Sequence, residues 1–205
     1  MDITIESLEF GTTSRQSRRA KSISEALEDR WVVAASNGDD SAFSRLVELH
    51  QDQVFQFCCR WLQNNEDARE AAQDTFVRAY EAIPRYRKQG KFTTWLYRIA
   101  LNLCRDHIRS KKSKQQKVTL SLDNKFDSPV CPLAQPDENA AQLDQRERLQ
   151  SAVLKLPEKL QAAVILYAYE GLSQDECAEI LNCSTRAVEG RLYRARTLLK
   201  EETKG

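Results

Sequence analysis

A strongly basic stretch of helical pattern lies between residues 86 and 117. Ten Lys or Arg stand there against one acid, Asp106, a local charge of +9 in a chain whose total is +1. Trp95, Ile99 and Leu103 recur at every fourth position, which places them on one face of a helix. A second set of positions, three or four apart, forms what we call the basic ridge: Arg98, Asn102, Arg105, Arg109 and Lys112. The stretch is therefore predicted to fold as an amphipathic helix with one buried face and one cationic face.

The residues ahead of this helix favour a nucleic acid as the partner of the ridge. Residues 88–91 (Lys88, Gln89, Gly90, Lys91) carry no apolar anchor and are predicted to form an exposed loop, with Thr93 as the helix cap. A row of cations suits a polyphosphate because each neutralised phosphate releases counterions. Three aromatic residues beside the loop are of the kind that stack on unpaired bases: Phe92, Trp95 and Tyr97. The alternative is that the ridge is an ordinary solvated surface and that Trp95 belongs to the core.

An acidic segment precedes the basic one. Residues 39–83 contain nine acids and four bases, a net charge of −5. Their apolar residues predict one helix from Asp39 to about Leu62 and another that is capped by Asn64 or Asn65 and ended by Pro84. The change of sign along the chain predicts two surfaces with different partners.

The remaining pattern predicts an all-α protein of two small helical domains joined by a flexible linker. Prolines 129, 132 and 136 and an acidic composition mark the linker. The predicted divisions are a disordered N-terminal tail (1–23), a first domain (24–112), the linker (113–141) and a second domain (142–205).

The second domain has the pattern of a helix-turn-helix. Ser173 and Glu176 form a capping box ahead of a short helix, and Ser184 is predicted to cap a longer one after a tight turn. Thr185, Arg186 and Glu189 then face outward in the first turns, the part of a recognition helix that reaches base edges. Further along, arginines are placed for phosphates or for further bases: Arg191, Arg194 and Arg196.

The composition argues against several other classes of protein. No run is long and apolar enough for a membrane span and the first residues lack a secretory signal, so we expect a cytoplasmic protein without membrane contact. The six cysteines form no CxxC pair and the two histidines lie in no ligand pattern, which favours reduced thiols and predicts neither metal nor cofactor. Clustered carboxylates and paired nucleophiles are also lacking, so no enzymatic reaction is expected.

Three segments, in order and spacing, resemble the extracytoplasmic-function (group IV) sigma factors of bacterial RNA polymerase. DAREAAQDTFVRAYEAIPRY is similar to the segment that binds the polymerase clamp, and KFTTWLYRIALNLCRDHIR to the promoter-melting and minus-10 segment. The last third, LPEKLQAAVILYAYEGLSQDECAEILNCSTRAVEGRLYRARTLLK, is similar to the region-four helix-turn-helix. The resemblance implies an initiation factor with promoter DNA and core polymerase as partners, the latter through its β′ clamp helices and β flap. It also implies a restraining anti-sigma factor and a linker in the RNA path.

The resemblance further implies a role for particular residues. The clamp helices would meet Glu70, Gln73, Asp74, Phe76, Val77 and Tyr80. The minus-10 element would be held by Lys88, Gln89, Gly90 and Lys91, which would capture a flipped base, and by Trp95, Arg98, Asn102, Arg105 and Arg109. The minus-35 element would be read by Ser184, Thr185, Arg186, Glu189, Arg191 and Arg194.

The chain departs from the family pattern at three places. Arg69 to Ala72 stand where Glu-Asp and larger aliphatic residues are common, RKQGK replaces an Arg-Gly-Asp-Ser type loop, and Glu189 stands where a basic residue is common. A carboxylate can accept a hydrogen bond from cytosine N4, so the promoter sequence does not carry over.

Two other interpretations remain open. A dimeric helix-turn-helix regulator would account for the last third of the chain alone. A nucleic-acid enzyme would need a catalytic cluster that the sequence does not show.

Overall fold

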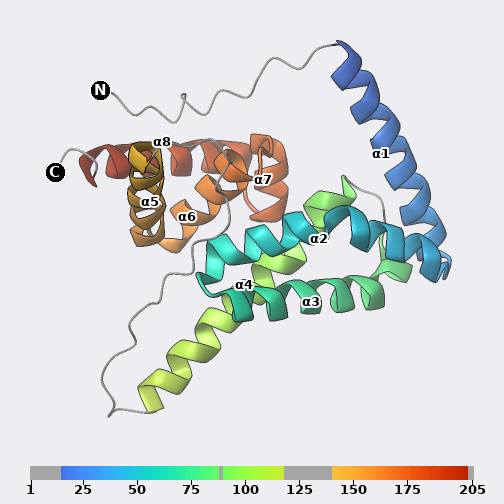
Figure 1. Ribbon diagram of the computed structural model, residues 1–205, viewed down its shortest axis with the longest axis horizontal. Helices are drawn as coiled ribbons and strands as arrows, with labels where there is room; N and C mark the ends of the chain where they lie inside the picture. Colours follow the sequence, from blue (N-terminus) through green and yellow to red (C-terminus); the bar gives the residue numbers. More distant parts are fainter. Residues whose placement is uncertain (1–14, 88–89, 118–139, 203–205) are drawn as a thin grey trace. The chain divides into compact units, whose positions relative to one another are not determined.

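The computed structural model describes residues 15–87, 90–117 and 140–202, with side chains described for 25–87, 90–111 and 148–202. All regular secondary structure in these ranges is helical (Figure 1). Contacts divide the chain into two compact units, one within Thr12–Cys131 and one within Pro132–Gly205. The all-α fold in two small helical units is therefore confirmed. Most of the predicted linker and residues 1–14 of the predicted tail lie outside the described residues.

In its described residues the first unit has four helices and one short turn of 3₁₀-helix. They are α1 (Arg15–Ser36), α2 (Asp40–Leu62), α3 (Asn65–Ala82), the 3₁₀ turn (Ile83–Arg85) and α4 (Phe92–Lys117). Helices α2, α3 and α4 pack against one another, and α1 packs on α2 (Figure 1). The largest fully buried side chains between them are Leu46, Phe57, Ile83, Leu96 and Leu101.

Asparagine and aspartate side chains begin α2 and α3 as the sequence predicts. The Asp39 carboxylate accepts hydrogen bonds from the backbone N–H groups of Ser41 and Ala42, at 2.9 and 3.1 Å. The Asn64 side chain accepts bonds of 3.0 Å from the N–H groups of Glu66 and Asp67. These contacts satisfy donors that the first turn of a helix leaves unpaired.

Three helix boundaries differ from the prediction. Helix α4 begins at Phe92, ahead of Thr93. The Phe92 side chain is buried and the Lys91 carbonyl accepts a hydrogen bond from Trp95 N–H, so Phe92 lies in the first turn. It runs to Lys117 rather than 112, since Lys and Gln favour helix and no breaker intervenes. Helix α1 begins at Arg15, inside the predicted tail, because residues 15–36 contain neither Gly nor Pro.

The second unit contains the predicted helix-turn-helix on two supporting helices. Its elements are α5 (Ala140–Lys155), α6 (Glu158–Val164), a π-helical turn that continues it (Ile165–Tyr169), α7 (Gln174–Ile180) and α8 (Thr185–Glu202). Helices α5, α6 and α7 all pack on α8. Asn182, with φ of 47°, makes the tight turn between α7 and α8.

Candidate nucleic-acid interfaces

Three of the four described residues of the basic ridge of α4 are exposed as predicted. Arg98, Asn102 and Arg109 are exposed and Arg105 is half-buried. The opposite side of the helix supplies buried residues, among them Leu96 and Ala100. Apolar packing therefore fixes which side of α4 the cations occupy.

Two of the three aromatic residues predicted to stack on bases belong to the core instead. Phe92 is 4% exposed and Tyr97 is 6% exposed, and the Tyr97 ring lies 5.1 Å from the ring of Phe57. Trp95 is half-buried. The prediction of three stacking rings is thus wrong for Phe92 and Tyr97, because the apolar face of α4 is wide enough to take both into the interior.

Tyr86, which the sequence pattern did not single out, packs against two aromatic residues of α4. Its ring centroid is 4.8 Å from that of Trp95 and 6.0 Å from that of Phe92. Its hydroxyl donates a hydrogen bond of 3.2 Å to the carbonyl oxygen of Gly90. The sequence signal for Tyr86 was its position, an aromatic residue shortly before residues 88–91 with Trp95 shortly after them. Of the loop residues, Lys88 and Gln89 lie outside the described part, Gly90 is half-buried and Lys91 is exposed.

The C-terminal half of α4 is tied to the start of α3. Lys111 Nζ pairs with Asp67 Oδ2, and His107 Nε2 lies 3.2 Å from Asp67 Oδ1 without the angle of a hydrogen bond. The Asp67 side chain is only 16% exposed. Lys111 therefore neutralises a carboxylate of this chain. It is less suited to bind a phosphate than exposed Arg109.

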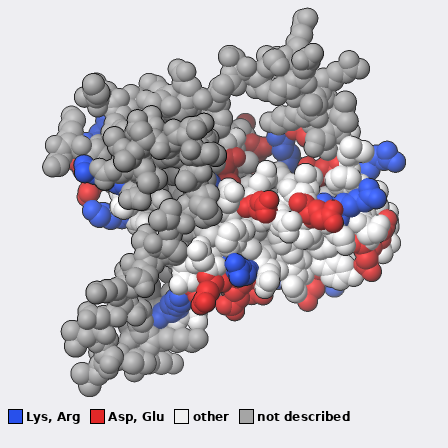
Figure 2. Space-filling model, in the orientation of Figure 1, with Lys and Arg blue, Asp and Glu red and all other residues white. Residues whose placement is uncertain are grey.

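A groove of about 660 Å³ lies between α2 and α3. Aliphatic and aromatic side chains line it, with polar groups among them: Val47, Gln51, Asp52, Phe55, Arg69, Ala72, Gln73, Phe76 and Val77. Beside it on α3, Glu70 and Asp74 are exposed, and Val77 is 56% exposed. Figure 2 shows acidic groups, with basic ones among them, on the face in view. Of the predicted clamp-binding residues, Gln73, Phe76 and Val77 thus line the α3 side of this groove.

Tyr80, predicted to bind the clamp, makes contacts within its own unit. Its hydroxyl donates a hydrogen bond of 2.8 Å to Asp40 Oδ1, and its ring lies edge-on to Phe43 at 5.1 Å. The hydrogen bond to Asp40 raises the pKa of Tyr80, because a phenolate beside a carboxylate is unfavourable. The ring remains 49% exposed, so Tyr80 offers a partner its ring rather than its hydroxyl.

Side-chain caps define the ends of the helix-turn-helix. Ser173 and Glu176 form the predicted capping box, with bonds of 3.2 and 2.7 Å between the backbone of one and the side chain of the other. The Ser184 hydroxyl accepts a bond of 3.2 Å from Ala187 N–H. This confirms that Ser184 caps α8, and the apolar residues spaced three or four apart along the helix form a buried inward stripe: Val188, Leu192, Ala195 and Leu199.

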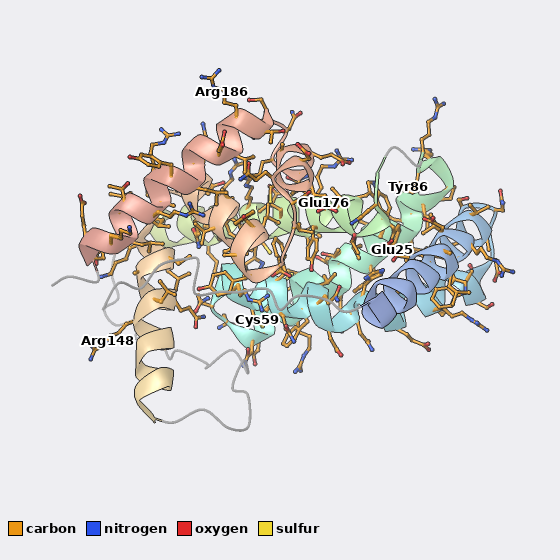
Figure 3. The ribbon with its side chains drawn as sticks, turned by 90° about the horizontal axis from the view of Figure 1, so that it is seen from above. Glu25, Cys59, Tyr86, Arg148, Glu176 and Arg186 are labelled. Atoms are coloured by element: carbon orange, nitrogen blue, oxygen red, sulfur yellow. The ribbon has the colours of Figure 1, made fainter. Side chains whose placement is uncertain are left out.

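The predicted base-reading residues of α8 differ in their exposure and in the hydrogen bonds that they make within the chain. Arg186 and Glu189 are exposed, and Arg186 extends away from the helix (Figure 3). The Thr185 hydroxyl instead donates a hydrogen bond of 2.7 Å to Asp175 of α7. Arg191 is half-buried, and Arg194 is exposed with its Nε donating to the Gly190 carbonyl at 3.1 Å.

Tyr193 was also missed. It is 72% exposed on the outward side of α8, between the positions of Glu189 and Thr197. The sequence signal for Tyr193 was its spacing, because it stands four residues after Glu189, which was predicted to read bases.

Within the described residues, no group of three or more His, Cys, Asp or Glu side chains is arranged to hold a metal ion. Among the helices described, none combines the length and the apolar character that crossing a membrane requires.

Comparison with known proteins agrees with this geometry. The family model for sigma-70 region 2 matches residues 46–114, and that for sigma-70 region 4 matches residues 146–199. The sigma factor SigW of Bacillus subtilis is 33% identical over 87% of this chain and 97% of its own length. The sigma-E factor of Haemophilus influenzae is 30% identical over 88% of this chain and 97% of its own.

A solved structure extends the likeness from sequence to fold. CnrH, in complex with the cytosolic domain of CnrY, superposes with a TM-score of 0.64 at 29% identity, over 87% of this chain and 97% of CnrH. Both matched regions and the relatives' nearly full coverage lead to one conclusion: the chain belongs to the extracytoplasmic-function sigma factors of the sigma-70 family, which are not enzymes but direct RNA polymerase to promoters and start transcription.

Proposed function

We propose that the sigma function is divided among three surfaces of this chain. The α2–α3 groove, with Glu70, Gln73 and Asp74 at its side, contacts the β′ clamp helices of core polymerase. The basic ridge of α4 and the loop at 88–91 hold the melted minus-10 element. Helix α8 reads the minus-35 element in the major groove, and the unit that carries it contacts the β flap. We assign the first two roles to residues 24–112 and the third to residues 142–205, with the acidic residues between them in the RNA path.

The observation that carries this proposal is the separation of surface chemistry within the first unit. The groove is apolar with a mixed polar rim, whereas the ridge exposes Arg98, Asn102 and Arg109. An apolar groove suits the side chains of a protein partner, and a row of cations suits a nucleic-acid backbone. One unit can therefore bind polymerase and DNA at the same time.

Strand separation would be driven by binding of the unpaired strand. Unstacking a base step costs a few kcal/mol. Stacking on an aromatic ring returns about 1–3 kcal/mol per base, and half-buried Trp95 is the ring on α4 best placed for it. Electrostatic contacts along the ridge add to this, so melting needs no separate energy source.

The test is run-off transcription with core polymerase, this chain and a library of promoters. Site-selective transcripts are expected, and their start sites would give both promoter elements. A chain that binds core polymerase but never produces selective transcripts would overturn the proposal.

Val77→Asp tests the groove separately. Because Val77 is 56% exposed and lines the groove, a carboxylate there should lower affinity for core polymerase by at least about tenfold while the helix content stays the same. Val33→Asp is the matched control, since Val33 is equally exposed, at 56%, on α1. Equal effects of the two changes would show that the groove is not the docking surface.

We also propose an anti-sigma factor as a partner, and we place the protein in the cytoplasm, where polymerase and promoter are found. The likeness to CnrH, solved with the cytosolic domain of CnrY, supports such a partner. Co-purification of proteins that bind this chain in the native host, with and without core polymerase added as a competitor, would test it. A protein captured only in the absence of polymerase, and which blocks run-off transcription, is the expected result.

A further inference from the structure

Gly190 stands in the middle of α8, where glycine is an unfavourable choice. A glycine inside a helix costs about 1 kcal/mol relative to alanine. A Cβ built at Gly190 would meet nothing within 4 Å, and its φ is not in the left-handed region. Neither packing nor backbone conformation within this chain therefore requires the side chain to be absent.

The neighbours of Gly190 on the helix surface are long side chains. Residues three and four apart share a face, which places Arg186, Tyr193 and Arg194 around it. Arg186 and Arg194 are exposed, and Tyr193 is 72% exposed. We call the bare backbone between these three side chains the Gly190 notch. Its floor is the Gly190 Cα, and the Gly190 carbonyl on its C-terminal side accepts a hydrogen bond of 3.1 Å from Arg194 Nε.

We propose that the Gly190 notch receives the C5-methyl group of a thymine in the minus-35 element. The methyl is the one apolar group that a base edge presents in the major groove, and proteins read it by apolar contact. The Arg186 stem and the exposed Tyr193 side chain supply apolar groups beside the notch, while the Arg186 guanidinium, which extends away from the helix, remains for a phosphate or guanine. Gly190 is thus a specificity-determining residue that lets α8 lie close to one base pair.

This inference rests on the proposed assignment of α8 to the minus-35 element, and it predicts opposite effects on stability and on binding. Gly190→Ala should make α8 more stable, because alanine favours helix and has free space. The same methyl should fill the notch and weaken binding of a minus-35 duplex by holoenzyme by about fivefold or more. A substitution that damaged folding would lower both quantities.

The experiment is a scan of the minus-35 element in which each thymine is replaced by uracil, which lacks only the methyl. Holoenzyme with the unchanged chain should lose about fourfold in affinity at one position, the factor for one methyl-sized apolar group. Holoenzyme with Gly190→Ala should show no loss at that position. Urea unfolding of the full-length chain, followed by circular dichroism, checks that Gly190→Ala is not less stable.

Thr197→Ala is the control, because Thr197 is exposed on the same side of α8 nearer its C-terminus. It should keep the uracil response of the unchanged chain. If the unchanged chain binds its promoter but responds to uracil nowhere, or if Gly190→Ala keeps the response, the notch does not read thymine. If holoenzyme shows no dependence on the minus-35 element at all, the assignment of α8 fails instead.

Discussion

The hydroxyl of Thr185 donates a hydrogen bond to the carboxylate of Asp175, with 2.7 Å between Oγ1 and Oδ1. The bond joins the first turn of α7 to the first turn of α8, the two helices of the helix-turn-helix. The sequence predicted that Thr185 reaches a base edge, but in the structure its donor is already occupied. The Thr185 hydroxyl therefore ties the start of α8 to α7, and we propose that it positions the recognition helix rather than donating to a base.

Thr185→Val should destabilise the second unit without changing base preference. Loss of one hydrogen bond at a solvent-accessible site costs about 0.5–1 kcal/mol. Binding to all minus-35 variants should fall by a similar factor, because the helix angle is less fixed. Urea unfolding and binding to a panel of minus-35 substitutions measure the two effects. Thr185→Ser keeps the hydroxyl and serves as the control, and a changed preferred base in Thr185→Val would show direct reading.

Arg98→Ala combined with Arg105→Ala should weaken open-complex formation and leave polymerase binding near its original strength. If each arginine neutralises one phosphate of the single strand, the slope of log affinity against log salt should fall by roughly 1.4. Permanganate reactivity of minus-10 thymines reports melting, and competition for core polymerase reports docking. Arg30→Ala, which removes an exposed charge from α1, is the control. A loss of polymerase binding would mean that the ridge belongs to the docking surface.

The sequence was enough to predict helix type and most helix starts, because these depend on local chemistry. Asn64, Ser173 and Ser184 bond to backbone groups two or three residues away, so their positions alone identify the caps. The inward stripe of α8 follows from helical period in the same way. The start of α4 was wrong by two residues because the burial of Phe92, a tertiary contact, outweighs the capping preference of Thr93.

The contents of the candidate sites were harder to predict, since they depend on contacts between helices. Spacing placed Arg98 and Asn102 on one exposed face correctly. It could not show that Tyr97 packs on Phe57, that Thr185 bonds to Asp175, or that Lys111 pairs with Asp67, because each partner lies on another helix. Tyr86 was missed because its contact with Trp95 is a tertiary one, between residues that do not share a helix.

Tyr86→Phe should impair capture of a minus-10 base while leaving the fold intact. The change keeps the ring against Trp95 but removes the hydroxyl that bonds to the Gly90 carbonyl. A hydrogen bond worth about 0.5–1.5 kcal/mol corresponds to a loss of about two- to tenfold. Fluorescence of 2-aminopurine placed along the non-template strand of the minus-10 element would report the capture. Tyr167→Phe, a half-buried tyrosine in the second unit, is the control. An unchanged signal would mean that the loop does not depend on this bond.

The thiol of Cys177 gives a prediction about pH. Burial raises the pKa of Cys177 to about 12, with the nearby Glu176 and Cys183 adding to the effect, and the side chain is fully buried between α7 and its neighbours. The ordinary value is 9.0, so the unfolded chain loses this proton near pH 9 while the folded chain keeps it. The stability that the folded state gains from the neutral thiol is fully present below pH 9 and is lost as pH rises towards 12.

Comparison with Cys177→Ala isolates this effect from other groups that titrate at high pH. The difference in free energy of unfolding between the unchanged chain and Cys177→Ala should be constant from pH 7 to about 8.5 and should then fall steadily as pH increases. Urea unfolding at each pH measures it. Alkylation gives a second readout, because a buried neutral thiol reacts slowly: in the folded chain at pH 8, iodoacetamide should modify half-buried Cys183 well before Cys177. A difference that stays flat up to pH 10.5, together with equal alkylation of the two thiols, would show that Cys177 ionises in the folded chain as it does in the unfolded one.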